Sequence, residues 1–142
     1  MSLTGPILII EDDADDQEML KAAVKTLEIP NKVIVFNNGV EAFEHLKVMK
    51  TQPFLILCDL KMPKMDGLEL RNAVENHPPL KKRSIPFVFI TGSADKNEVN
   101  DAYQLSVQGF FTKPNTFKGW DDLVAMIVNY WKECLHPYKL TG

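Results

Sequence analysis

Five residues of the types used in metal and phosphoryl chemistry lie at the ends of short apolar runs. Glu11 and Asp12 follow the first run, Asp59 follows the third, Thr91 ends the fourth and Lys113 follows the fifth. Two carboxylates about 4 Å apart repel by roughly 4 kcal/mol at an effective dielectric constant near 20, so three of them need cations beside them. If these residues converge, they predict a site that holds a metal ion and a phosphoryl group.

The residue types narrow that chemistry further. Oxygen ligands without histidine or cysteine nearby favour Mg²⁺, which is usually held by one or two carboxylates together with phosphate oxygens. A lysine and a hydroxyl can each bind a phosphoryl oxygen, and a carboxylate can itself be the nucleophile, forming an aspartyl-phosphate. The set as a whole therefore indicates phosphoryl transfer with Mg²⁺ as the cofactor.

The apolar runs predict the strands that would bring these residues together. Short runs rich in β-branched and aromatic residues indicate buried strands at 7–10, 33–36, 54–59, 87–91 and 109–112. Apolar residues at helical spacing follow each of them, so that five strands alternate with five helices. The helix after the third strand is expected to end at residues 76–79, where two prolines stand.

This alternation predicts an α/β fold with a five-stranded parallel sheet, flavodoxin-like strand order 2-1-3-4-5 and helices on both faces. In such sheets ligands bind at the carboxyl ends of the strands. The chain of 142 residues is interpreted as one domain, with a core over about 6–135 and a short tail over 136–142.

Composition excludes several function classes. Apolar residues make up 45% and charged residues 25%, which is typical of a globular protein, and no apolar run is long enough to cross a bilayer. The net charge of −3 gives no reason to expect a nucleic-acid partner. Cys58 and Cys134 stand in apolar contexts and indicate reduced thiols, hence a cytoplasmic protein without signal peptide or membrane association.

Each candidate residue also has a structural interpretation. The acidic run 11–16 could serve only as the N-cap and first turn of a helix, and Asp13, Asp15 and Asp16 are assigned to that role. Thr91 could belong only to a turn, and Lys113 only to the exit of a strand. The coincidence of suitable residue types at four strand ends favours the site.

The chain resembles the receiver domain of two-component response regulators over essentially its whole length. The matching stretches are residues 7–12 (ILIIED), 59–67 (DLKMPKMDG), 90–92 (ITG) and 111–114 (FTKP). A narrower and weaker resemblance is to single-domain regulators paired with phytochrome-type histidine kinases, and it rests on residues at 80–81, 85–86, 103 and 130–131.

The resemblance implies a role for each acid. Asp59 would accept a phosphoryl group from the phosphohistidine of a kinase. Glu11, Asp12 and Asp59 would hold Mg²⁺, with the backbone carbonyl of Lys61 as a further ligand. The protein would not be an enzyme beyond catalysing its own phosphorylation and dephosphorylation.

The resemblance also implies how the phosphoryl group would be bound and sensed. Thr91 and Lys113 would bind it, and Phe110 occupies the aromatic switch position, where it lacks the hydroxyl of a tyrosine. The Lys113–Pro114 peptide bond would be cis, although only about 5% of such bonds are. Lys61 and Ser93 stand where the family varies, and they are expected to tune the phosphoryl lifetime.

The expected partners are a sensor histidine kinase or phosphotransfer protein and an unknown downstream protein. A homodimer could form through the face made by the fourth helix, the fifth strand and the fifth helix. Met126, Val128, Tyr130 and Tyr138 would widen the apolar stripe of the last helix for such a contact. The alternative is a broad helix packed under the tail.

Two other classes of protein share parts of this pattern. A phosphatase of the haloacid dehalogenase class would need Asp-x-Asp directly after the first strand, whereas that strand is followed by Glu11-Asp12-Asp13. A flavodoxin-type flavin module would need a phosphate loop rich in Ser, Thr and Gly at this point, and the acidic loop would repel a phosphate. Both fit less well than a receiver domain.

Overall fold

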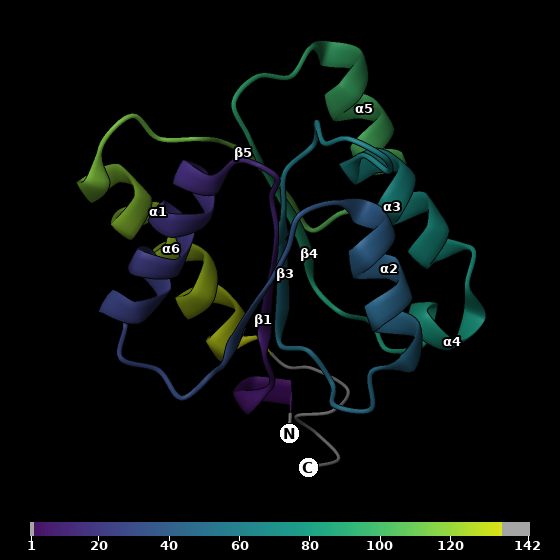
Figure 1. Ribbon diagram of the computed structural model, residues 1–142, viewed down its shortest axis with the longest axis horizontal. Helices are drawn as coiled ribbons and strands as arrows, with labels where there is room; N and C mark the ends of the chain where they lie inside the picture. The colour runs from purple at the N-terminus through teal and green to yellow at the C-terminus, as the bar shows by residue number, and fades with distance from the viewer. Residues whose placement is uncertain (1, 135–142) are drawn as a thin grey trace.

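Five parallel strands form the centre of the molecule. The computed structural model describes residues 2–134, so the predicted tail over 136–142 lies outside the described residues. The strand order is β2-β1-β3-β4-β5 (Figure 1), which confirms the predicted fold. The strands are β1 (Ile7–Ile10), β2 (Val33–Phe36), β3 (Leu55–Cys58), β4 (Phe87–Thr91) and β5 (Gly109–Thr112).

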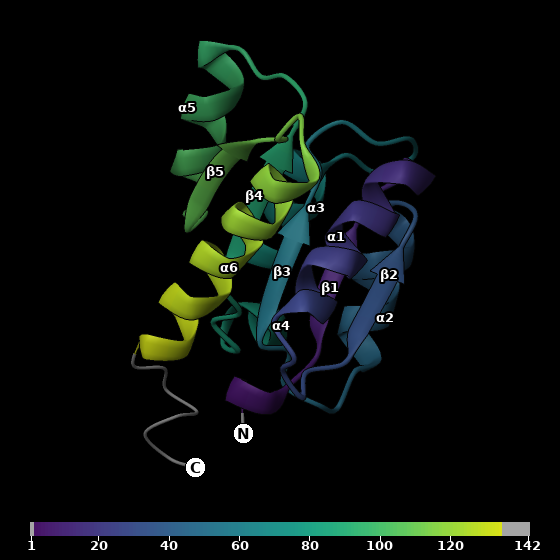
Figure 2. The ribbon, with the colours of Figure 1, turned by 90° about the vertical axis from the view of Figure 1, so that its left-hand side faces the viewer.

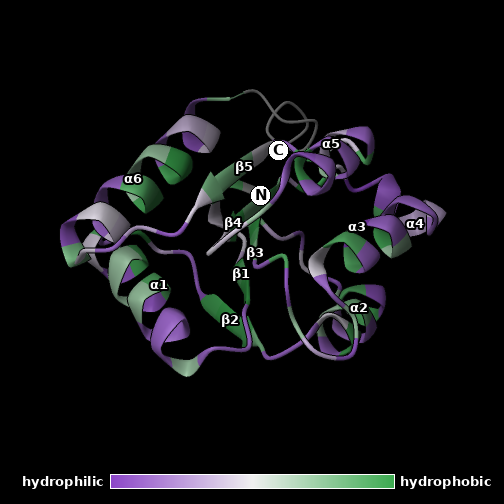
Figure 3. Ribbon diagram, turned by 90° about the horizontal axis from the view of Figure 1, so that it is seen from above, coloured by the Kyte–Doolittle hydropathy of each residue, from purple (hydrophilic) through white to green (hydrophobic). Residues whose placement is uncertain are grey.

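Helices cover both faces of the sheet. Figures 1 and 3 show α1 and α6 on one face and the remaining α-helices on the other. The helices are α1 (Ala14–Thr26), α2 (Gly39–Val48), α3 (Gly67–Glu75), α4 (Pro78–Lys81), α5 (Lys96–Gln104) and α6 (Phe117–Glu133), preceded by a 3-10 turn at Ser2–Thr4. No described helix has both the length and the apolar character needed to span a membrane.

The prediction of five helices was wrong by one. Helix α3 ends at Glu75, close to the predicted end, but Pro78 and Pro79 then begin the single turn of α4. Proline is well tolerated in the first turn of a helix, because the backbone N–H groups there have no partner within the helix. The two prolines therefore separate two helices.

The core has two layers, one on each side of the sheet. Along β1, Leu8 and Ile10 face one layer while Ile7 and Ile9 face the other, and all four are fully buried. Alternation between two buried faces is the reason why a parallel strand is apolar throughout its length. Figure 2 shows α1 and α6 side by side across one face of the sheet.

Strand register brings the candidate residues to a common edge. Ile10 is aligned with Cys58, so the residues after them, Glu11 and Asp59, leave neighbouring strands at the same level. Thr91 is aligned with Thr112 in the same way, one residue before Lys113. The positions predicted from four separate stretches are therefore brought to the carboxyl ends of adjacent strands.

Candidate functional site

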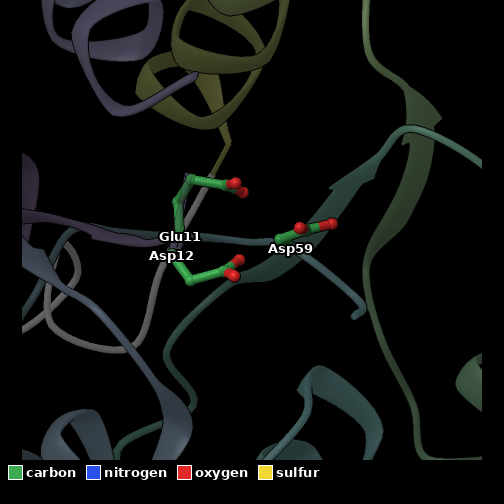
Figure 4. Close-up of side chains that lie close together, drawn as sticks. All are labelled: Glu11, Asp12 and Asp59. Atoms are coloured by element: carbon green, nitrogen blue, oxygen red, sulfur yellow. The ribbon is translucent and has the colours of Figure 1, made fainter. Parts of the chain in front are cut away.

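Three carboxylates converge where β1 and β3 end. One oxygen each from Glu11, Asp12 and Asp59 lies within 4.8 Å of the others (Figure 4). Glu11 is 1% exposed and Asp59 7% exposed, whereas Asp12 faces solvent. Burial and the negative charge of Asp59 raise the pKa of Glu11 to about 8, against the lowering effect of Lys113. A cation placed between these groups would relieve their repulsion.

The cluster fits a small divalent cation. Around an octahedral Mg²⁺ with metal–oxygen distances of about 2.1 Å, neighbouring oxygens are about 3.0 Å apart and opposite oxygens about 4.2 Å apart. Three oxygens within 4.8 Å of one another can therefore share one ion once their side chains draw together, by at most about 2 Å for a neighbouring pair. Among residues 2–134 this is the group of acids with such spacing, and it contains oxygen ligands alone, which Mg²⁺ and Mn²⁺ prefer.

Backbone contacts hold the two buried acids in place. The backbone N–H of Leu60 donates a hydrogen bond to Asp59 Oδ1 at 2.8 Å, and the N–H of Asp13 donates to Glu11 Oε1 at 3.2 Å. The N–H of Asp59 donates to the carbonyl of Ile10 at 2.9 Å, which joins the two strand ends. One oxygen of Asp59, Oδ2, is thereby left on the side of Lys113.

Lys113 supplies the positive charge of the site. Its Nζ lies 3.1 Å from Glu11 Oε1, 3.3 Å from Asp59 Oδ2 and 2.6 Å from Asp16 Oδ2, and the side chain is 15% exposed. Burial alone would lower the pKa of Lys113, but the hydrogen bond that its ammonium donates to Asp16 and the charges of Glu11 and Asp59 outweigh burial and raise the pKa. Lys113 is therefore a cation at every pH at which the protein would function.

Asp16 is the member of the site that the sequence did not predict. Asp13 is the N-cap of α1, as expected, because its side chain accepts hydrogen bonds from the N–H groups of Asp15 and Asp16. The side chain of Asp16, assigned to the same role, instead contacts Lys113, 97 residues further along the chain. The one hint in the sequence is that the predicted Lys113 would need acidic partners, and this does not say which acid of the run supplies them.

The side chains of Thr91 and Lys61 contact residues outside the carboxylate cluster. Thr91, at the end of β4, is buried, and its hydroxyl donates a hydrogen bond to the carbonyl of Ser93 at 3.3 Å. Lys61 is exposed and its ammonium lies 3.8 Å from Glu98 on α5. The expected cis bond after Lys113 is not found, because residues 2–134 contain trans peptide bonds alone.

The predicted switch residue and partner face involve residues outside the carboxylate cluster. The ring of Phe110 is partly buried, with its centroid 5.6 Å from that of Phe89. On α6, Met126 and Tyr130 are 52% and 62% exposed, but Val128 is fully buried and cannot widen a surface stripe, while Tyr138 lies outside the described residues. A cavity of about 320 Å³ adjoins the exposed pair, lined also by Val88, Gln108, Phe111, Ile127 and Trp131.

Comparison with known proteins identifies the family that this chain matches. Residues 7–127 match the response regulator receiver domain family. The response regulator Rcp1 of Synechocystis sp. (strain ATCC 27184 / PCC 6803 / Kazusa) is 32% identical over 132 residues, which cover 89% of this chain and 88% of Rcp1.

Solved structures agree with this assignment. The Mn²⁺-bound form of Rcp1 has a TM-score of 0.80 at 31% identity, covering 92% of this chain and 96% of that one. The phosphorylated cyanobacterial phytochrome response regulator RcpA has a TM-score of 0.83 at 27% identity, with the same coverage. The bacteriophytochrome response regulator AtBRR has a TM-score of 0.72 at 32% identity, covering 93% and 96%.

These relatives confirm both the broad resemblance and the narrower one to regulators of phytochrome pathways. With a family match over most of its length, the predicted sheet order and an acidic cluster beside a lysine at the strand ends, the chain belongs to the response regulator receiver domain family.

Proposed function

We propose that this protein is a response regulator that accepts a phosphoryl group on Asp59 in a Mg²⁺-dependent reaction. The donor would be the phosphohistidine of a sensor histidine kinase or of a phosphotransfer protein. The observation that carries the proposal is the convergence of Glu11, Asp12 and Asp59 with Lys113 at one sheet edge. A buried acid with a cation site on one side and an ammonium on the other suits a nucleophile that must receive a polyanion.

The transfer exchanges one bond to phosphorus for another. A carboxylate oxygen of Asp59 forms a bond to phosphorus, the bond from phosphorus to the imidazole nitrogen breaks, and the electron pair remains on the imidazole. The product is an acyl phosphate on Asp59 and a histidine in the donor protein. Glu11, Asp12, Asp59 and the carbonyl of Lys61 would hold Mg²⁺, which neutralises charge on the phosphoryl oxygens when bound.

Two further residues would bind the phosphoryl group once it is on Asp59. Lys113 already lies 3.3 Å from Asp59 Oδ2, so its ammonium can move onto a phosphoryl oxygen with little displacement. Thr91 has a weaker attachment, a 3.3 Å hydrogen bond to Ser93, which its hydroxyl can exchange for a phosphoryl oxygen. Charge-assisted hydrogen bonds of this kind supply the free energy for a conformational change.

The change would spread from Thr91 into the adjoining loop and α5. Phe110 packs against Phe89 of β4, so a shift of the strand ends would alter the packing of this ring. The face formed by α5, β5 and α6 would then present the change to an unknown downstream protein or to a second copy of this chain. Met126 and Tyr130 are exposed there beside an apolar cavity.

We propose a cytoplasmic protein that signals through protein contacts, without a nucleic-acid or membrane partner. The net charge of −3 and the free cysteines, Cys58 and Cys134, support this. Its only catalysis would be its own phosphorylation and dephosphorylation.

Intact mass after incubation with acetyl phosphate tests the proposal. We expect one added phosphoryl group with Mg²⁺ and none when EDTA removes the metal. Asp59→Asn should take up none, whereas Asp15→Asn, which removes an exposed acid from the first turn of α1, should behave like the native protein. An adduct that persists in Asp59→Asn would place the acceptor elsewhere and refute the assignment.

Amide NMR shifts test the proposed switch separately. Phosphorylation should shift the resonances of residues 91–115, which include the loop after β4, α5 and β5. Identical spectra over this range in the phosphorylated and unphosphorylated protein would show that the site and the α5–β5–α6 face are uncoupled.

A further inference from the structure

The shortest contact of Lys113 is to an acid that lies outside the carboxylate cluster. Asp16 Oδ2 is 2.6 Å from Nζ, against 3.1 Å for Glu11 and 3.3 Å for Asp59. An ammonium has three N–H donors, and here three carboxylates accept them. The direction in which Lys113 points toward Asp59 is therefore set by its two other partners.

Asp16 is available for this contact because α1 begins differently from α3 and α5. In α3 and α5 the acid at the third helical position, Glu69 or Glu98, accepts a hydrogen bond from the backbone N–H of its N-cap residue. Asp16 occupies the third position of α1, but the N–H of Asp13 donates to Glu11 instead. The carboxylate of Asp16 is thus left to reach across to the strand edge.

The other two partners of Lys113 have a second task in the proposed reaction. Glu11 and Asp59 belong to the group of acids that can hold a metal ion, and Asp59 would also carry the phosphoryl group. Asp16 belongs to neither arrangement. When Glu11 binds the cation and Asp59 carries the phosphoryl group, Asp16 is the remaining carboxylate that can hold Lys113 at the site.

From this geometry we infer that Asp16 is a positioning residue that holds the ammonium of Lys113 beside Asp59 during phosphoryl transfer. The inference rests on the proposed function, since it assigns Asp16 a part in that reaction. By neutralising Lys113, Asp16 also reduces the repulsion between this ammonium and a divalent cation at Glu11 and Asp59.

The rate of phosphorylation by acetyl phosphate at saturating Mg²⁺ tests the inference. Asp16→Asn keeps the shape of the side chain and removes its charge, and we expect a roughly tenfold slower reaction, equivalent to about 1.4 kcal/mol. Asp16→Glu, which restores the charge, should recover most of the rate. Asp15→Asn removes a neighbouring charge that does not contact Lys113, and it should stay within about twofold of the native protein.

Two further measurements separate a positioning role from a structural one. In a Lys113→Ala background, Asp16→Asn should have no additional effect on the rate, because a residue that acts through Lys113 loses its effect with it. In the unphosphorylated protein, the ¹⁵N resonance of the Lys113 ammonium should shift in Asp16→Asn and remain unchanged in Asp15→Asn. Thermal unfolding checks that all variants are folded.

The failures of the two proposals are distinguishable. If the native protein takes up a phosphoryl group on Asp59 and Asp16→Asn does so equally fast, the role of Asp16 is refuted and the proposed function stands. If Asp16→Asn slows the reaction equally with and without Lys113, Asp16 does not act through this lysine. If the native protein takes up no phosphoryl group, both proposals are wrong, even if the ammonium resonance responds to Asp16.

Discussion

Replacing Arg71 with methionine should loosen the C-terminal end of α5 from the rest of the fold. Arg71 on α3 is 7% exposed, and its guanidinium donates hydrogen bonds to the carbonyls of Leu105 at 2.8 Å and Ser106 at 3.3 Å. It also pairs with Glu75 at 2.9 Å and lies 5.4 Å from the ring centroid of Phe87. A cation at the last carbonyls of a helix stabilises its C-terminus.

The contacts of Arg71 indicate how much stability the substitution should remove. Hydrogen bonds from a charged donor contribute roughly 1.5–3 kcal/mol, and a cation near an aromatic ring about 0.5–1 kcal/mol. Burial lowers the pKa of Arg71, and the charge of Glu75 opposes this lowering. Part of the free energy gained from the contacts of Arg71 therefore only offsets the cost of removing its charge from water. Methionine retains most of the apolar packing, and we therefore expect a loss of about 2.5 kcal/mol.

Denaturation and hydrogen exchange together measure this effect. For a chain of 142 residues, an unfolding entropy of about 2.1 cal/mol/K per residue converts the loss into a Tm lower by about 8 °C. Hydrogen exchange followed by mass spectrometry should show faster exchange concentrated in peptides covering residues 96–108. This anchor is expected to act as the fixed end of α5 when phosphorylation moves the loop after Thr91.

Lys81→Met is the matched control. Lys81 pairs with the same acid, Glu75, at 3.5 Å, but it is 62% exposed, and exposed ion pairs contribute little. Its loss should leave the Tm within about 2 °C of the native value. Arg71 does not anchor α5 if Arg71→Met is equally harmless, or if its faster exchange is spread evenly over the chain instead of being concentrated near α5.

Two other predictions concern the surroundings of the acceptor. A Cβ on Gly67 would lie 2.5 Å from the backbone oxygen of Asp59, whereas one on Gly92 would meet nothing within 4 Å. Gly67→Ala should therefore lower the free energy of unfolding in urea by more than about 2 kcal/mol, and it should weaken Mg²⁺ binding in a titration. Gly92→Ala should stay within about 1 kcal/mol of the native protein, and equal stabilities of the two variants would show that Gly67 is not tightly packed. Burial raises the pKa of the Cys58 thiol, which stays protonated and unreactive at pH 8 in the folded protein, whereas the partly exposed Cys134 can react. A disulfide-exchange reagent should release one equivalent from the native protein and a second after unfolding, and two rapid equivalents would show that Cys58 is accessible.

The sequence by itself determined the sheet and the residues at its edge. Apolar runs of about four residues, each followed by a helical pattern, allow little other than a parallel α/β sheet, because both faces of every strand must be buried. The carboxyl ends of such strands meet at one edge. Glu11, Asp12, Asp59, Thr91 and Lys113 could therefore be selected before any contact between them was known.

Only the tertiary structure decided which of the other side chains join them. At the start of α1, the sequence cannot say whether Asp13, Asp15 or Asp16 faces the strand edge, because this depends on how the helix starts and on its rotation about its own axis. The rotation of α6 about its own axis likewise decides that Val128 is buried and Met126 is exposed. The contacts of Asp16 with Lys113 and of Arg71 with Leu105 join residues far apart in the chain. Their geometry depends on how the helices pack, which a local sequence pattern does not predict.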